Sequence, residues 1–572
     1  MVNLIIDGKN VTVENGITIL EAARSAGINI PTLCYLKDIN EIGACRVCVV
    51  EIEGNANLCA ACNTQAEDGM VIYTNSPRVR TARRINLELI LSAHNTNCTS
   101  CVRNGNCTLQ TLCRDLNITD IPFEVTYKKK KWDTSIPLIR DREKCVKCMR
   151  CISVCEKVQG LGVWDIVGTG HRTTVGIRGT TDFNATKCAL CGQCITHCPV
   201  GALHERDDTR NLLDALGDPD KIVVAQVAPA VRTAWGEDLG LTREQATVGK
   251  MVSALRTIGF DYVFDTDFAA DMTIMEEGSE LLERLSHKED YSWPMFTSCC
   301  PGWIRFLKHE YPEFTKNLSS AKSPQQMFGS IAKTYFAKKL GVDAEKIVCV
   351  SIMPCIAKKY EADVPQVSSV SEKDVDIVLT TREICRMLRS GGLDFAKIQE
   401  SEFDAPLGLG TGAGVIFGTS GGVMEAALRS AHYLITGENP DADKFSAVRG
   451  MDGWKERTVQ VGDATLNVAV TNGLANARQL IEAIKAGKVS YDFVEIMACP
   501  GGCVGGGGQP IRDGQELAAE RSKTLRNLDS ASVIRFSHEN PFIKTVYEEY
   551  LEKPNSHIAH ELLHTSHQEW DI

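Results

Sequence analysis

Long hydrophobic runs are absent from this 572-residue sequence. No uninterrupted apolar stretch approaches the ~20 residues that a membrane-spanning helix needs, so no membrane segment is predicted. The beginning, MVNLIIDGKNVTVENG, has no basic region followed by a long apolar run, and no signal peptide is expected. We therefore expect a soluble, cytoplasmic protein.

An excess of positive charge and a phosphate-binding loop are also absent. The formal net charge of −11 argues against a nucleic-acid partner. The short basic run Lys128–Lys131 is interpreted as a solvated loop in preference to a docking site for an acidic partner. The stretch GLGTGAGVIFG is rich in glycine, but it fits neither G-x-G-x-x-G after a strand nor a P-loop. No nucleotide site is predicted in this chain.

Cysteine, in contrast, is abundant, with 24 residues. In a reducing cytosol these thiols are expected to bind metals, because disulfides are rarely stable there. The hydrophobic fraction of 43% is sufficient for globular cores. The length favours about three or four domains.

Residues 1–78 are predicted to form a small β-rich domain. VNLIIDG and VTVENG read as a hairpin, and the helical pattern TILEAARSAG ends at Gly27. Four cysteines with one close pair favour a 2Fe–2S cluster, since zinc sites more often have two close pairs. The spacing resembles plant-type ferredoxins and the iron–sulfur subunit of respiratory complex I. That resemblance implies the ligands Cys34, Cys45, Cys48 and Cys62, with Cys59 as the competitor of Cys62.

Residues 79–120 combine an amphipathic helix with the pattern H-x3-C-x2-C-x5-C, formed by His94, Cys98, Cys101 and Cys107. Three thiolates leave a 4Fe–4S cluster one ligand short, and either His94 or Cys113 could complete it. A zinc knuckle is the alternative. The same pattern in complex I and in FeFe-hydrogenases, where a histidine completes the cluster, implies His94.

Residues 138–209 contain two runs of C-x2-C-x2-C-x3-C, an internal duplication typical of bacterial ferredoxins with two 4Fe–4S clusters. In such ferredoxins the fourth cysteine of each run binds the cluster of the other run. The resemblance therefore implies one cluster on Cys145, Cys148, Cys151 and Cys198, and another on Cys155, Cys188, Cys191 and Cys194.

From about residue 215 short β-rich runs alternate with helical patterns, which predicts an α/β domain with mainly parallel strands. Three cysteine stretches follow strand-like runs: TSCCPGW, MPCIAKKYEAD and MACPGGCVGGGGQP. Together Cys300, Cys355, Cys499 and Cys503 could hold one more 4Fe–4S cluster. The glycine run Gly505–Gly508 is expected to let backbone amides approach cluster sulfur closely.

These three stretches resemble the signatures of FeFe-hydrogenases, and the upstream modules match the long clostridial type of that family. The resemblance implies a multidomain α/β and α+β chain with a two-lobed catalytic domain over 215–540 and a C-terminal belt segment over 541–572. It implies reversible reduction of protons to H2 at an H-cluster, a 4Fe–4S cubane joined through Cys503 to a diiron centre with CO, cyanide and a bridging dithiolate. One 2Fe–2S and three accessory 4Fe–4S clusters would supply electrons.

The resemblance also implies the walls of the diiron pocket. Lys358 corresponds to a lysine that binds cyanide, as suits an ammonium beside an anionic ligand. Ala230 stands where the family often has a serine donor, so the potential or the catalytic bias is expected to shift. The remaining pocket positions are Pro229, Ser323, Pro324, Gln325, Met353, Phe417, Gly418 and Met497.

A proton route is implied in the same way. Glu277, Glu280 and Arg284 share one face of a predicted helix, a pattern that alone favours a solvent-exposed salt-bridged stripe. The family comparison instead makes these three residues, with Ser319, a pathway that ends at Cys299. Adjacent side chains of an extended segment point to opposite sides, so the two cysteines are expected to face different surroundings. The resemblance implies that Cys299 faces the diiron unit and Cys300 the cubane. A thiol with an ordinary pKa near ~8.5 exchanges a proton at modest cost.

Several alternatives remain at this point. Electrons could come from ferredoxin, or from flavin- and NAD-binding diaphorase subunits in a complex, which could be electron-bifurcating. Maturation proteins would have to build the diiron centre. A non-catalytic H2 sensor, a cluster-assembly relative or a complex I subunit are rival classes. Cys59, Cys113, Cys349 and Cys385 have no assigned role and are expected to be buried thiols.

Overall fold

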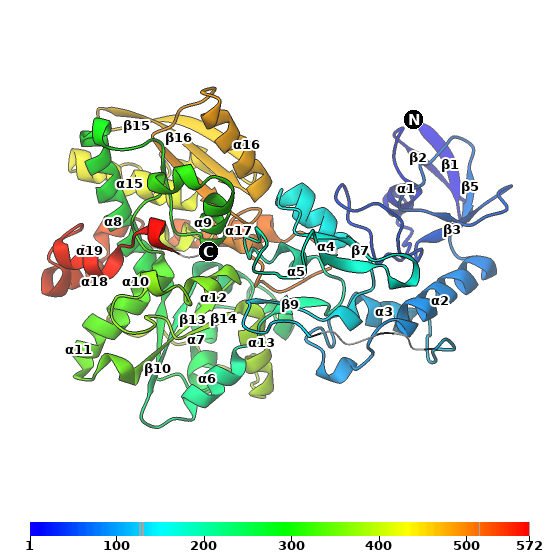
Figure 1. Cartoon of the computed structure of the whole chain (residues 1–572), viewed down its shortest axis with the longest axis horizontal. Helices are drawn as coiled ribbons and strands as arrows, with labels where there is room; N and C mark the ends of the chain where they lie inside the picture. Colours follow the sequence, from blue (N-terminus) through cyan, green and yellow to red (C-terminus); the bar gives the residue numbers. More distant parts are fainter. Residues whose placement is uncertain (125–126, 128–130, 514, 571–572) are drawn as a thin grey trace. The chain divides into compact units, whose positions relative to one another are not determined.

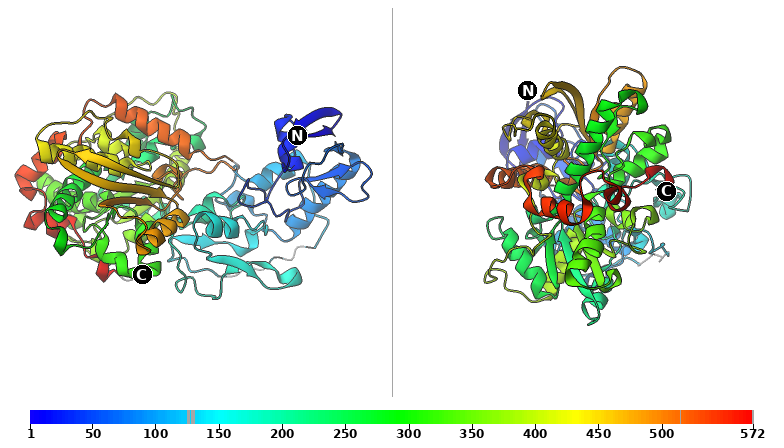
Figure 2. Two further views of the ribbon diagram at one scale, coloured as in Figure 1. Left: turned by 90° about the horizontal axis from the view of Figure 1, so that it is seen from above. Right: turned by 90° about the vertical axis from the view of Figure 1, so that its left-hand side faces the viewer.

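The computed structural model describes residues 1–124, 127, 131–513 and 515–570 (Figures 1 and 2). Most of the run Lys128–Lys131 lies outside the described residues. Two compact units are present, and each is described separately. The first contains Met1–Val158, Gly162–Thr186 and Gln193–His204, and the second contains Gln159–Leu161, Lys187–Gly192 and Glu205–Ile572. No helix among the described residues is long and apolar enough to cross a membrane.

The first unit begins with a five-stranded sheet in the order β2-β1-β5-β3-β4. Strands β1 and β2 form the predicted antiparallel hairpin, and both turn residues, Asp7 and Gly8, have positive φ, as a tight hairpin turn requires. Helix α1 packs its apolar face on this sheet, and the Thr18 side chain caps its first turn. The elements are Val2–Ile6 (β1), Lys9–Val13 (β2), Ile19–Ser25 (α1), Val49–Ile52 (β3), Cys59–Ala60 (β4) and Val71–Tyr73 (β5).

The rest of the first unit consists of short elements between cysteine-bearing loops. The long helix α2 begins at Pro77, where a missing amide hydrogen costs nothing, and Ser76 caps it. The elements are Pro77–Ser92 (α2), Thr108–Asp115 (α3), Leu138–Arg140 (β6), Arg150–Ser153 (α4), Trp164–Val167 (β7), Thr174–Ile177 (β8), Gln193–Thr196 (α5) and Leu203–Glu205 (β9).

The second unit confirms the predicted α/β architecture with mainly parallel strands. Its first sheet has the order β11-β10-β13-β14, and every neighbouring pair is parallel. Helices α6, α7, α12 and α13 pack around it (Figure 1). The elements are Thr209–Leu216 (α6), Ile222–Val227 (β10), Val248–Thr257 (α7), Tyr262–Asp265 (β11), Ile347–Met353 (β13), Ala357–Glu361 (α12), Ile377–Thr380 (β14) and Thr381–Ser390 (α13).

A second sheet with the order β12-β17-β16-β15 forms the other lobe. Strands β12, β17 and β16 are parallel, while β15 pairs antiparallel with β16 at the edge, and these two gold strands run side by side in Figure 2. Helices α15 and α16 pack against this sheet. The elements are Met295–Phe296 (β12), Gly422–Thr436 (α15), Trp454–Val461 (β15), Ala464–Asn472 (β16), Leu474–Lys485 (α16) and Phe493–Met497 (β17).

The remaining helices of the second unit include α8, which contacts α10, α14 and α15. The Asp265 side chain caps α8, and most of the α8 side chains are buried. The elements are Thr266–Ser286 (α8), Pro301–Glu310 (α9), Pro324–Ile331 (α10), Ala337–Leu340 (α11), Gly412–Ile416 (α14), Ala518–Ala531 (α17), Pro541–Val546 (α18) and His557–Leu563 (α19).

Candidate functional site

Cysteines gather where parallel strands of the second unit end. Strand β12 leads to Cys299 and Cys300, β13 leads to Cys355, and β17 leads to Cys499. The carboxyl ends of parallel strands are where α/β folds place their ligands. The predicted location of these cysteines, in loops after apolar strands, is therefore confirmed.

The thiols of Cys300, Cys355, Cys499 and Cys503 form one cluster. Burial raises the pKa of Cys499 well above its ordinary value, and the neighbouring thiols of Cys355, Cys300 and Cys503 raise it further. Burial and Cys300 likewise raise the pKa of Cys355 to about 12. Four neighbouring sulfurs in a poorly solvated place, which oppose one another's ionisation, suit a cationic iron–sulfur centre that would bind them as thiolates.

Glycines let the backbone fit closely around this cluster. A Cβ atom on Gly508 would lie 2.8 Å from the carbonyl carbon of Pro354 and 3.0 Å from the amide nitrogen of Cys355. A Cβ atom on Gly506 would lie 2.2 Å from the Pro354 oxygen. No larger residue fits at either position without moving the backbone, so these glycines let their loop pass close to the backbone of Pro354 and Cys355.

Lys358 reaches from α12 toward the cysteine loop. Its Nζ donates to the Cys299 carbonyl oxygen at 3.1 Å and to the Glu361 carboxylate at 2.8 and 3.1 Å. Burial alone would lower the pKa of Lys358, but the Glu361 charge raises it above its ordinary value. The same carboxylate accepts from Ser323 Oγ at 2.8 Å and from Gln325 Nε2 at 3.0 Å. Three of the predicted pocket residues are thus brought together by Glu361.

Glu361 itself was not singled out from the sequence. Its signal would have been the i, i+3 spacing from Lys358 on one short helix, a weak cue where charged residues are common. The structure shows that it is only 1% exposed, so it neutralises a buried ammonium. Pro324 begins α10 directly after Ser323, which sets the direction of the Ser323 and Gln325 side chains.

Apolar residues form two further groups beside the cysteines. Phe417 and Met497 lie in one buried group, against which Cys299 and Cys300 pack. Ala230 lies in another, with Cys503 at its margin. A Cβ atom on Gly418 would be 3.2 Å from that of Ala230, so these two predicted positions are neighbours. The remaining two predicted pocket residues are also buried. Met353 is the last residue of β13, and Pro229 begins the turn after β10.

The adjacent cysteines have different surroundings. Cys300 ends the loop before α9, and its Sγ accepts from the Ala498 amide at 3.5 Å. Cys299 retains some accessible surface, yet it lies deep enough that burial raises the pKa of its thiol well above the ordinary value, with Glu277 contributing next. The ordinary pKa expected for Cys299 is therefore wrong, because a thiol near a carboxylate in a poorly solvated place holds its proton more tightly.

The helix face with Glu277, Glu280 and Arg284 is buried, so the exposed-stripe reading is excluded: the three residues are 1%, 8% and 5% exposed. Arg284 donates to Glu280, and Ser319 Oγ donates to Glu280 Oε2 at 2.7 Å. Neither carboxylate oxygen of Glu277 completes a hydrogen bond to another described residue. Burial and the Glu280 charge raise the pKa of Glu277 to about 8, against smaller opposing effects of Ser319 and the Ser298 amide.

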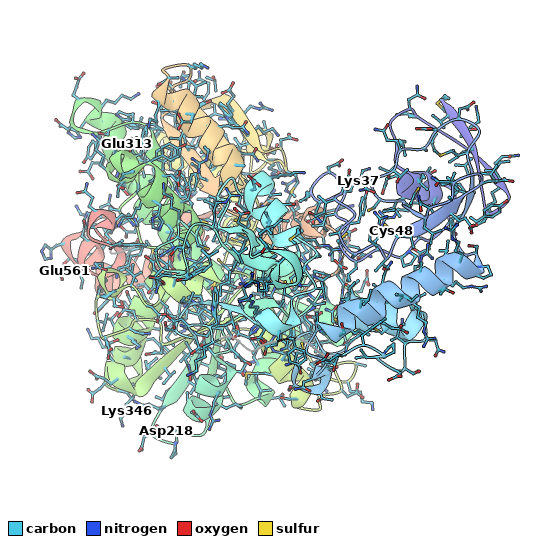
Figure 3. The ribbon with its side chains drawn as sticks, turned by 45° about the vertical axis from the view of Figure 1, so that its right-hand side comes forward. Lys37, Cys48, Asp218, Glu313, Lys346 and Glu561 are labelled. Atoms are coloured by element: carbon cyan, nitrogen blue, oxygen red, sulfur yellow. The ribbon has the colours of Figure 1, made fainter. Side chains whose placement is uncertain are left out.

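In the first unit, the predicted 2Fe–2S ligands converge. The thiols of Cys45 and Cys62 lie within hydrogen-bonding reach of Cys34, and that of Cys48, labelled in Figure 3, lies within reach of Cys62. The competitor Cys59 instead contacts Asn55 Nδ2 at 3.5 Å and the Asn57 carbonyl. The converging set thus matches the ligands implied by the ferredoxin resemblance.

A cavity of about 510 Å³ in the first unit is lined by His94, Cys98, Cys101, Cys107 and Cys113. The Nδ1 atom of His94 is buried and has no hydrogen-bond partner among the described residues. Burial lowers the pKa of His94 to about 4, so the ring is neutral and can offer a lone pair. This nitrogen fits a cluster that three thiolates leave one ligand short, while Cys113 stays available on the same wall.

The ferredoxin-like cysteines of the first unit include Cys145, Cys148, Cys151 and Cys198, which line one small cavity. Lys147 and Met149, between them, have positive φ, an unfavourable conformation for non-glycine residues that turns backbone amides toward a common centre. The other predicted set is divided between the units, with Cys155 and Cys194 in the first and Cys188 and Cys191 in the second.

Short contacts connect several of these cysteine loops. In the first unit, Asn40 Nδ2 donates to the carbonyls of Cys34 and Cys148 at 2.7 and 3.0 Å. Cys107 Sγ lies 3.9 Å from the Pro199 carbonyl, next to Cys198. In the second unit, Cys499 Sγ lies 3.8 Å from the Cys191 carbonyl. Fold and thiol clusters together define an oxidoreductase with several iron–sulfur centres.

Comparison with known families specifies the class. The family described as "Iron only hydrogenase large subunit, C-terminal domain" matches residues 221–507, and the iron hydrogenase small subunit matches 515–570. A 2Fe-2S iron-sulfur cluster binding domain matches 1–77, the NADH-ubiquinone oxidoreductase-G iron-sulfur binding region 83–122, and a 4Fe-4S dicluster domain 144–202. The chain belongs to the FeFe-hydrogenase family and is an FeFe-hydrogenase with accessory iron–sulfur domains.

Three similar proteins illustrate this membership. The NADP-reducing hydrogenase subunit HndD of Solidesulfovibrio fructosivorans is 49% identical over 99% of this chain and 98% of its own length. Iron hydrogenase 1 of Clostridium pasteurianum is 40% identical over 99% of both chains. The solved apo [FeFe]-hydrogenase of Chlamydomonas reinhardtii is 46% identical, with a TM-score of 0.56 over 62% of this chain and 98% of that one. These relatives favour the enzyme over the non-catalytic classes.

Proposed function

We propose that the chain catalyses 2 H⁺ + 2 e⁻ ⇌ H2 at the cysteine cluster of the second unit, with Cys300, Cys355, Cys499 and Cys503 as ligands of the cubane and Cys503 as the link to the diiron unit. The observation that carries the proposal is the convergence of these four thiols beside Cys299 and Lys358. When bound, the H-cluster supplies the metal chemistry that forms and splits H2. The protein binds it, excludes water and carries protons and electrons.

Three groups of side chains would hold the diiron unit. The Lys358 ammonium, kept charged by Glu361, offers a donor to an anionic cyanide. Phe417, Met497 and Met353 supply apolar walls. Ala230 offers no hydroxyl donor, and its Cβ instead packs near Gly418. The unit is therefore held mainly by shape and by a single buried cation.

The proposed proton pathway begins at Glu280, which Arg284 holds by an ion pair, and leads through Ser319 and Glu277 to Cys299. The Ser319 hydroxyl joins the two carboxyl groups, since it bonds to Glu280 and approaches Glu277. A hydroxyl accepts and donates at once, so it can relay a proton without holding a charge. Glu277, with its pKa raised to about 8, keeps its proton at neutral pH and can pass it to Cys299.

Electrons would enter the first unit at two places. The Asn40 bridge connects the Cys34 and Cys148 loops, and the Cys107 contact connects the His94 cavity to the Cys198 loop. Both the 2Fe–2S and the His-coordinated cluster would therefore deliver to the cluster on Cys145, Cys148, Cys151 and Cys198. The Cys191–Cys499 contact would provide the last step to the cubane. The proposed electron route would thus be branched, with two entrances and one exit.

The resemblance to HndD, a subunit of an NADP-reducing hydrogenase, supports partner subunits that oxidise or reduce NAD(P). We expect flavin- and NAD-binding subunits in a complex, with ferredoxin as a further electron partner and maturation proteins as the source of the diiron unit. Untagged purification under anaerobic conditions tests this expectation. Co-elution of a flavoprotein would support the complex, and a homogeneous, active single chain would contradict it.

Infrared spectroscopy of the matured protein tests the catalytic site. We expect bands of metal-bound CO and cyanide in the wild type, together with H2 evolution. Cys503→Ala should lose these bands and all activity, because the link to the diiron unit is removed, while the accessory clusters keep their iron. Cys385→Ala, which removes a buried thiol bonded to the Trp235 carbonyl, is the matched control and should keep the bands. Absence of the bands from active, fully matured wild type would refute the site.

A further inference from the structure

The outer end of the proposed proton pathway is closed by a residue that is a poor proton donor. Arg284 is buried, donates to Glu280 and to the Leu318 carbonyl, and lies with its guanidinium 5.3 Å from the centre of the Tyr291 ring. A guanidinium has a pKa above about 12 and stays charged in proteins, so it cannot release protons at a useful rate near neutral pH. Glu280 therefore needs a different group to supply its proton.

A histidine from the C-terminal segment occupies a suitable place. His564 follows helix α19, and its ring is buried. Nδ1 lies 2.8 Å from Ser320 Oγ, and Nε2 lies 3.0 Å from Glu276 Oε2. Both ring nitrogens thus have a hydrogen-bond partner, which is the arrangement that lets an imidazole accept a proton on one side and release it on the other.

Ser320 connects this histidine to the pathway. Its hydroxyl bonds to His564, while its amide donates to both oxygens of Glu280 at 3.1 and 3.2 Å. Proton transfer from this hydroxyl to the carboxylate that its own amide contacts requires a rotation about the Cα–Cβ bond of Ser320. The preceding residue, Ser319, bonds to the same carboxylate at 2.7 Å. The turn Ser319–Ser320 therefore holds Glu280 through one hydroxyl and one amide, and its second hydroxyl bonds to His564.

The surface next to His564 is suited to collecting protons. Helix α19 lies at the surface, where Figure 3 labels its exposed residue Glu561. His560, one turn before His564, is exposed, and the two ring centres are 4.2 Å apart. Burial and the neighbouring His564 lower the pKa of His560, while the carboxylates of Glu276, Glu280 and Glu283 oppose that effect and attract a proton held on the ring.

We propose that His564, with the exposed His560 beside it, is the proton entrance to Glu280. This inference rests on the proton pathway proposed above. In each transfer the Nδ1–H bond of the imidazole breaks as its proton moves to the Ser320 oxygen, the Ser320 hydroxyl proton moves to the Glu280 carboxylate, and Nε2 takes a proton from the Glu276 carboxyl, its hydrogen-bond partner at 3.0 Å. Glu276, left ionised, takes a new proton from the His560 side, and rotation of the imidazole ring restores the tautomer with its proton on Nδ1. Arg284 is a positioning residue that holds the Glu280 carboxylate. The titratable groups around His564 are Glu276, which also accepts from the Tyr547 hydroxyl, together with Glu280, His560 and, near His560, Glu283.

A purely structural role of His564, as an anchor for the C-terminal segment, makes different predictions. An anchor would be replaced well by any residue that keeps the two hydrogen bonds, whereas a relay needs a group that titrates. The Ser320 side chain separates the two readings most directly. Ser320→Ala keeps the amide that holds Glu280 and leaves helix α19 in place, but it removes the relaying hydroxyl, while Ser320→Thr retains a hydroxyl.

The experiment measures H2–D2O exchange and H2 evolution of the matured variants in a series of buffers set between about pH 6 and about pH 9. We expect His564→Gln and Ser320→Ala to slow exchange about tenfold, a modest share of the 10²–10⁴-fold typical of general acid–base catalysis. Ser320→Thr should stay near wild type, and added imidazole should restore His564→Gly. His557→Gln alters an exposed histidine on the same helix and should change nothing. The infrared bands and the midpoint of thermal unfolding should be the same in all of these variants as in the wild type.

Wild-type exchange rates and an unaltered pH profile in both His564→Gln and Ser320→Ala would overturn the proposal. So would a slow His564→Gly variant that keeps its infrared bands but is not restored by imidazole, since that result marks an anchor. Failure of the proposed function would give different results. Wild-type protein that carries the diiron bands would evolve no H2, which contradicts the proposed reaction, or Cys299→Ser would evolve H2 at the wild-type rate, which contradicts the proposed proton pathway.

Discussion

Cys299→Ser should lower the rate of H2 evolution at least about a hundredfold, within the range that a positioned proton-transfer group contributes. Cys299 lies at the inner end of the pathway, where Glu277 acts on its thiol and Lys358 bonds to its carbonyl. A serine hydroxyl fills nearly the same space but holds its proton more tightly than a thiol. The expected result is a protein with normal iron content and infrared bands that turns over very slowly.

The matched control is Cys349→Ser. Cys349 is another buried thiol, on β13 beside Gln226 Nε2, and is not part of the proposed pathway. This variant should lose some stability and keep its rate per diiron centre. Activity, iron analysis and infrared spectra of the two variants provide the measurement. A Cys299→Ser protein with a near-normal rate would show that protons reach the diiron unit by another route.

Glu277→Gln should lower the rate of H2 evolution by a similar factor, about 10²-fold or more. It should also remove the pH dependence of the exchange rate at about pH 8. Because burial and Glu280 raise the pKa of Glu277 from 4.5 to about 8, the carboxyl is protonated at neutral pH and ionises as the pH rises through about 8. The protonated donor therefore becomes scarce above that pH. Wild-type H2–D2O exchange should decline on the alkaline side of about pH 8, while the amide variant should be slow at every pH.

Asp271→Asn is the control for a buried carboxyl on the same helix. Burial raises the pKa of Asp271 to about 6, and its partners are Thr411, Ser537 and Asn540, away from the pathway. This variant should keep both the rate and the alkaline decline. If Glu277→Gln instead retained the wild-type rate and its decline near pH 8, Glu277 would not be the titrating relay.

The accessory domains could be predicted well because their ligands are close in sequence. C-x2-C-x2-C-x3-C places three thiols within one short loop, so spacing alone restricts the geometry. The hairpin of β1 and β2 and the parallel strands before each cysteine loop were predictable for the same reason, since alternation and turn residues are local signals. The cavity around His94 agrees with the histidine that the motif required.

The burial of charged groups could not be predicted in the same way. Glu277, Glu280 and Arg284 show a spacing that surface helices share, and tertiary packing removes them from solvent. Residues 317–320, distant in sequence, bond to Glu280 and Arg284. The pKa values of Glu277 and Cys299 follow from that packing, because desolvation acts on the charged form. Glu361 and His564 were missed because their partners are contacts that sequence spacing does not single out as functional.

What the sequence by itself determined was the kind of protein. Cysteine number and spacing indicate several metal clusters, because ligand spacing is a local property, and the resemblance of three cysteine stretches to the signatures of FeFe-hydrogenases indicates the class. Only the tertiary structure decided which side chains meet across long separations. It brought Ser320 to His564 and Lys358 to the Cys299 carbonyl. Protonation, burial and pairing depend on those distant neighbours, so the routes of protons and the holding of the diiron unit could be argued only from the folded chain.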